Sequence, residues 1–210
     1  MVNMKLDYDI VRKSLDFAYD KAVNGIAGLD SAYDLAHDYM KGDGALYKKS
    51  NSLVNWQCSK AATSGFITGI GGLLTIPVAL PANITSVLFV QVRMIAAIAI
   101  MGGYDVKDDR VRSLVYSCLV ASSCKEVLKN FGIKLGQKIA VKAIQQIPVA
   151  IVTKINQAVG FRLLTKFGEK GLINLGKAIP LLGGIIGGSF DLIATKKIGN
   201  IARDIFTPIV

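Results

Sequence analysis

An almost uncharged stretch of forty-four residues constrains this chain more than any other feature. Between Lys60 and Asp105 the one charged side chain is Arg93. The stretch is longer than the roughly eighteen apolar residues that a membrane-spanning helix needs. Glycines and two prolines interrupt its first half, however. The stretch is therefore either membrane-inserted or the core of a helical protein.

The glycines and prolines favour close helix packing over a lipid-facing span. Glycines four residues apart let two helix backbones approach closely, and a proline bends or ends a helix. Residues 82–102 form the cleanest apolar helix and end at a pair of glycines. We interpret residues 61–104 as a closely packed helical hairpin buried in protein, with membrane contact at its edge. The residues expected to shape it are Gly65, Gly69, Gly72, Pro77 and Pro81.

Helical spacing of apolar residues recurs along the rest of the chain, whereas alternating strand patterns are scarce. Further helices are expected over residues 6–24, 31–40, 45–56, 105–131 and 132–177, the last broken near Pro148 and at Gly160, Gly168 and Gly171. The chain is thus predicted to be all-α, with residues 1–210 forming one compact helical bundle around the apolar hairpin. Residues 1–60 supply polar amphipathic helices, and residues 105–210 supply a helical half with a second uncharged segment at 178–190.

Positive charge is concentrated in the second half of the chain. Residues 1–60 hold eight acidic and eight basic side chains, whereas residues 110–210 hold fifteen lysines and arginines against four acids. Basic residues are attracted to an anionic membrane surface by about 1 kcal/mol each. Nucleic acid is the rival partner for a basic surface, but aromatic side chains are sparse among these lysines and no nucleic-acid-binding signature is present. An anionic membrane surface is the favoured partner.

Arg93 is the isolated charge of the apolar stretch. An unpaired buried charge costs several kcal/mol, so we expect an acidic partner, with Asp105 and Asp191 as the candidates. The alternative is that the side chain reaches an aqueous face. Trp56 lies where the sequence passes from charged to apolar, a position typical both of interfacial aromatics and of the edge of a protein core.

The residue types that carry catalysis or bind metals form no motif here. His37 is the single histidine, and Cys58, Cys118 and Cys124 make no CxxC pair. Asp16 lies with other aspartates on one helix face, but Arg12 and lysines between them favour a solvated, ion-paired face. We therefore predict a protein that is not an enzyme and holds no metal or cofactor.

The central block carries a resemblance to a known family. The segment NSLVNWQCSKAATSGFITGIGGLLTIPVALPANI, followed by QVRMIAAIAIMGGYD, resembles the hallmark region of the EcsC family. The positions that match the family pattern are Trp56, Gly65, Gly69, Gly72, Pro77, Pro81, Arg93, Gly103 and Asp105. The resemblance implies a compact, helical bacterial protein without an agreed biochemical activity. The family takes its name from a bacterial gene that lies beside a pair of ABC-transporter genes. This gene neighbourhood implies a role at the cytoplasmic membrane, with an ABC-transporter-related membrane protein as the partner.

These observations lead to two alternative functions. In the first, the chain is a non-enzymatic helical protein that contacts anionic lipid or a membrane protein at the inner face of the bacterial cytoplasmic membrane. The N-terminus has no apolar signal segment, so the protein is expected in the cytoplasm, peripheral to that membrane or partly inserted in it. In the second, it is a soluble all-α interaction or hydrophobic-ligand-binding module with the apolar block as its core.

Overall fold

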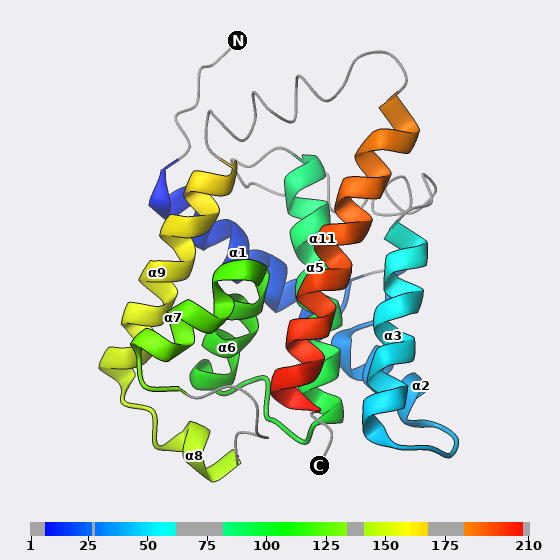
Figure 1. The fold of residues 1–210 in the computed structure, drawn as a ribbon, viewed down its shortest axis with the longest axis horizontal. Coiled ribbons are helices and arrows are strands. Elements are labelled where there is room, and N and C mark those ends of the chain that lie inside the picture. Colours follow the sequence, from blue (N-terminus) through cyan, green and yellow to red (C-terminus); the bar gives the residue numbers. More distant parts are fainter. Residues whose placement is uncertain (1–6, 27, 62–81, 134–140, 168–182, 208–210) are drawn as a thin grey trace.

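The computed structural model describes residues 7–26, 28–61, 82–133, 141–167 and 183–207 (Figure 1). Apart from an isolated bridge between Ile26 and Leu29, these residues contain no strand, and the predicted all-α fold is confirmed. The elements are α1 (Tyr8–Asn24), α2 (Ala32–Met40), α3 (Leu46–Ala61), α5 (Ala82–Met101), α6 (Asp109–Leu119), the 3₁₀ turn η2 (Ala121–Ser123), α7 (Cys124–Asn130), α8 (Val141–Gln145), α9 (Val149–Phe167) and α11 (Gly183–Phe206).

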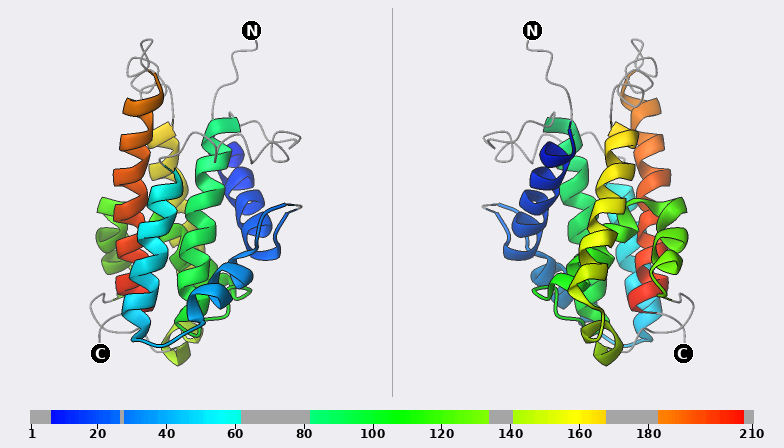
Figure 2. Two further views of the ribbon diagram at one scale, coloured as in Figure 1. Left: turned by 90° about the vertical axis from the view of Figure 1, so that its right-hand side faces the viewer. Right: turned by 90° about the vertical axis from the view of Figure 1, so that its left-hand side faces the viewer.

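The apolar helix α5 is the centre of the bundle. Helices α1, α2, α3, α6 and α11 all pack against it, and every residue from Leu88 to Ala99 is buried. Figure 2 shows α5 between a layer formed by α3 and α11 and a layer formed by α1 and α2. The second half of the uncharged stretch is therefore protein core. Residues 62–81, which include the glycines and prolines of the predicted hairpin, lie outside the described residues.

The helix ends follow from local hydrogen bonds that the sequence encodes. The Asp7 carboxylate accepts a hydrogen bond from the backbone N–H of Ile10 at 2.8 Å and caps α1. Ser31 and Asp34 form a capping box at the start of α2. Asp108 caps α6 through the N–H of Arg110. Such side chains satisfy the N–H groups that a helix leaves unpaired at its first turn.

Two expectations about helix breaks were wrong. The single helix expected over residues 105–131 is interrupted, because α6 ends at Leu119 and Ala121 adopts a φ of +39° before α7 begins. The reorientation buries Val127 and Leu128 of α7. Conversely, α9 runs through Gly160 without a break. The glycine leaves room for a neighbouring helix, because a Cβ at that position would lie 2.5 Å from the ring of Tyr8. Gly160 thus permits close packing of α1 on α9.

No helix within the described ranges is both long enough and apolar enough to cross a membrane.

Candidate functional site

Arg93 lies on α5 and is 4% exposed. Its Nη1 donates a hydrogen bond to the backbone carbonyl of Asp30 at 3.0 Å, and its guanidinium lies 5.5 Å from the centre of the Phe89 ring. Its Nε is buried and has no hydrogen-bond partner among the described residues. Burial lowers the pKa of Arg93, and the charge of Asp30 opposes this shift. Arg93 therefore fastens the segment before α2 to the central helix.

The structure describes the side chain of one of the two candidate acidic partners of Arg93, namely Asp105. Asp105 accepts a hydrogen bond from the backbone N–H of Lys107 at 2.8 Å and makes no ion pair with Arg93 in the described part of the chain. The side chain of Asp191 lies outside the described residues. Asp30, whose backbone carbonyl accepts the hydrogen bond from Arg93, was not among the candidates and is 63 residues away along the chain.

Of the remaining candidates, the structure describes Trp56 and not the glycines and prolines of the predicted hairpin. Trp56 lies on α3 and is 52% exposed. Outside the described residues lie Gly65, Gly69, Gly72, Pro77 and Pro81. Three other regions gather polar or exposed side chains, and sequence reasoning found none of them.

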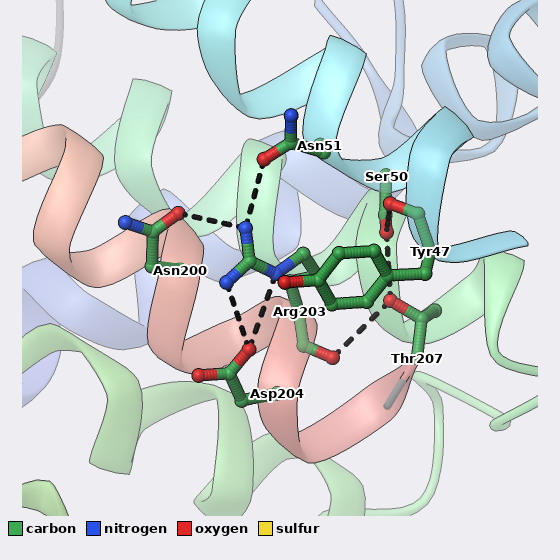
Figure 3. Close-up of polar contacts among 7 residues, drawn as sticks. All are labelled: Tyr47, Ser50, Asn51, Asn200, Arg203, Asp204 and Thr207. Atoms are coloured by element: carbon green, nitrogen blue, oxygen red, sulfur yellow. Dashed lines mark hydrogen bonds and ion pairs between the residues drawn. The ribbon is translucent and has the colours of Figure 1, made fainter. Parts of the chain in front are cut away.

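The first is a polar cluster that joins the beginning of α3 to the end of α11 (Figure 3). Arg203 donates from Nε and Nη2 to Asp204, and from Nη1 to Asn51 at 2.8 Å and to Asn200 at 3.1 Å. Its guanidinium lies 4.4 Å from the centre of the Tyr47 ring. Beside it, the hydroxyls of Ser50 and Thr207 are 2.8 Å apart. Every nitrogen of the guanidinium has a protein partner, so the cluster holds two helices together and has little capacity for a ligand.

The second region, here called the arginine cleft, is a cavity of about 310 Å³ between α1, α6 and α9. At one wall Asp16 accepts hydrogen bonds from Arg112 Nη2 at 2.6 Å and from the Tyr116 hydroxyl at 3.0 Å. Burial raises the pKa of Tyr116, so the phenol stays protonated. Asp16 of α1 thus pairs with residues of α6. This corrects the interpretation that the aspartates of residues 6–24 lie on a solvated helix face. Two further arginines, Arg12 and Arg110, also line the cavity.

The third region, here called the basic groove, lies between α9 and α11 beside η2 and has a volume of about 750 Å³. Phe161 and Ile193 line it and are 66% and 59% exposed. The charged side chains of its described lining are Arg162, Lys166 and Lys197, and no acid lines it among the described residues. The groove is therefore an apolar surface bordered by positive charge. Arg162 is partly neutralised by Glu126, 3.1 Å away.

The three cysteines are buried, free thiols. Burial raises the pKa of Cys118 well above its ordinary value, and the neighbouring Cys124 adds to the shift. Burial also raises the pKa of Cys58. Since only the thiolate is a strong nucleophile, these residues are poorly suited to covalent catalysis. No group of three potential metal ligands occurs among the described residues.

We expect all three thiols to resist Ellman's reagent in the native protein at pH 8, because all three are buried and the pKa values of Cys58 and Cys118 are raised, which leaves little accessible thiolate. Addition of denaturant should release all three for reaction. Absorbance at 412 nm measures the reaction, and rapid labelling of any one cysteine in the folded protein would contradict the assignment.

Comparison with known sequences gives a family assignment. Residues 44–207 match the EcsC protein family. The chain belongs to the EcsC family. No curated protein and no solved structure matches it. In this EcsC protein the matched span runs from just before α3 to Thr207, so it contains the polar cluster and the basic groove but excludes α1 and α2.

Proposed function

We propose that this EcsC protein is a non-enzymatic, peripheral membrane-binding protein whose basic groove contacts anionic lipid at the cytoplasmic face of a membrane. The observation that carries the proposal is that two large exposed apolar side chains, Phe161 and Ile193, line one groove together with three cations and, among the described residues, no acid. The excess of basic residues over residues 110–210 supports the same partner.

The groove has the two properties that interfacial binding requires. Apolar side chains insert at the boundary between headgroups and acyl chains, and nearby cations attract anionic headgroups. Burial of a side chain such as Phe161 is worth about 2 kcal/mol, and each lysine near the surface adds about 1 kcal/mol. Because α5 is enclosed by other helices, lipid contact at this level of the bundle has to use surface residues.

Replacing Phe161 with serine is expected to weaken binding to vesicles of phosphatidylcholine and phosphatidylglycerol about tenfold, because the inserted ring is lost. Flotation in a density gradient measures the bound fraction against lipid concentration. Met40→Ser is the matched control, since Met40 is 43% exposed on α2, away from the groove. If wild-type protein fails to float with these vesicles at low salt, the proposal is overturned.

Replacing Lys197 with glutamine is expected to weaken the same binding about fivefold, the equivalent of about 1 kcal/mol. Lys48→Gln on α3 removes an equal charge outside the groove and should have little effect. Added salt should reduce wild-type binding, since exposed charges are screened. Equal losses for the two lysines would show that net charge, and not the groove, directs the interaction.

A further inference from the structure

We propose that the arginine cleft binds a small zwitterion, namely a free amino acid with an aliphatic side chain. The cleft is separate from the basic groove: it uses α1, α6 and the first part of α9, whereas the groove uses α11 and the end of α9. The inference is therefore independent of lipid binding. Its cavity of about 310 Å³ lies at the lower end of the roughly 300–1,000 Å³ typical of small-ligand pockets.

One of the three arginines of the cleft, the exposed Arg12, is not neutralised by any described residue. Arg112 is paired with Asp16 at 2.6 Å. Arg110 donates from Nε to the Ile147 carbonyl at 2.9 Å and lies 3.8 Å from Asp108. Arg12 has no hydrogen bond or ion pair with any described residue. A guanidinium presents planar paired donors that match a carboxylate, so Arg12 is suited to the carboxylate of the ligand.

The cleft also contains two acceptors that have no donor among the described residues, the exposed Asp109 carboxylate and the buried amide oxygen of Asn156. The Asp109 carboxylate lines the cavity and has no hydrogen bond or ion pair within the described ranges. The Asn156 Oδ1 is buried and has no hydrogen-bond partner in the described part of the chain. A buried acceptor left without a donor costs about 1–3 kcal/mol. An ammonium group carries three N–H donors and a positive charge, so it has enough donors for both acceptors and its charge suits the carboxylate.

The rest of the lining is apolar on one side. Leu15 of α1 faces the cavity together with Val149 and Val152 of α9. Val149 is 69% exposed, so a ligand that covers it removes apolar surface from water. Arg12 thus matches the carboxylate of the ligand, and Asp109 and Asn156 match its ammonium group. The leucine and the two valines match its aliphatic side chain. These three features together select an aliphatic amino acid over a simple anion.

Isothermal titration calorimetry of the full chain with L-leucine, 4-methylpentanoate and isoamylamine tests the proposal. The last two probes keep the aliphatic group of leucine but carry only the carboxylate or only the amine. We expect saturable heat with leucine and at least tenfold weaker binding of either single-charge probe. Arg12→Gln and Asp109→Asn should each weaken leucine binding at least tenfold. Lys13→Gln and Asp9→Asn are matched controls, because both residues are exposed on α1 and neither lines the cleft.

Three results would each overturn the proposal. The first is the absence of leucine binding by the wild-type protein. The second is equal affinity for 4-methylpentanoate, which would mean that the amine is not recognised. The third is unchanged leucine affinity in Arg12→Gln, which would place the ligand elsewhere. Circular dichroism melting of each variant separates loss of binding from loss of fold.

Discussion

Replacing Gly102 with alanine is expected to lower the free energy of unfolding by about 3 kcal/mol, among the largest effects of a single methyl group in this chain. A Cβ at this position would overlap the backbone carbonyl oxygen of Phe206 and lie 2.9 Å from the Tyr104 ring. The Tyr104 and Phe206 rings pack edge to face with centroids 5.2 Å apart, and both residues are buried. Because a backbone atom cannot rotate aside, the end of α11 has to move, and overpacking of this kind costs about 1–3 kcal/mol or more.

Gly103→Ala is the matched control for this substitution. Gly103 has a φ of +84°, and an added Cβ there would meet nothing within 4 Å. Its replacement therefore costs only the strain of a left-handed backbone, about 1–2 kcal/mol. Chemical denaturation monitored by circular dichroism measures both variants. A smaller loss for Gly102→Ala than for Gly103→Ala would show that the junction between α5 and α11 is loosely packed.

Replacing Arg93 with alanine is expected to lower the free energy of unfolding by about 3 kcal/mol. The substitution leaves the Asp30 carbonyl without its charged donor and opens a cavity beside Phe89 in the core. A hydrogen bond from a charged group is worth about 1.5–3 kcal/mol, and loss of buried volume adds to the cost. Arg93→Met refills most of the volume, so we expect it to recover about half of the loss. Urea unfolding gives both values.

A double-mutant cycle identifies the partner of Arg93. Because Asp105 makes no ion pair with Arg93, the effects of Arg93→Ala and Asp105→Asn should add within about 0.5 kcal/mol. Arg93→Ala and Asp30→Asn should be non-additive by about 0.5–1 kcal/mol, the range of partly exposed charge pairs. A coupling to Asp105 as large as the coupling to Asp30 would contradict the assignment.

Local patterns in the sequence predicted many of the elements of the fold. The helix over residues 82–101, the short helix that ends at Met40 and the break near Pro148 all follow from spacing, helix-end signals and proline geometry. The same local patterns did not predict the break after Leu119 or the continuity of α9 through Gly160. Both depend on contacts between distant segments, such as that of Gly160 with Tyr8, and local propensity carries no information about them.

The candidate sites were less predictable than the helices. Arg93 was recognised because a lone charge in an apolar stretch is conspicuous, but its partner was not. Phe161 and Ile193 are ordinary apolar residues of two amphipathic patterns, and their exposure side by side becomes evident only when α9 and α11 are placed. The same holds for Arg12 and Asp109, which come from separate helices and line one cavity.

The sequence by itself determined that the chain is helical, that it belongs among EcsC proteins, and that its uncharged stretch has to be shielded from water. These properties depend on residue type and on spacing along the chain. The tertiary structure decided what does the shielding: for Leu88 to Ala99 it is the five helices around α5. It also decided which charges remain without partners, because pairing depends on distances of a few ångströms between helices. Spacing along the chain does not give these distances, so it did not show that the backbone carbonyl of Asp30 accepts the hydrogen bond of Arg93, or that Arg12 has no partner among the described residues.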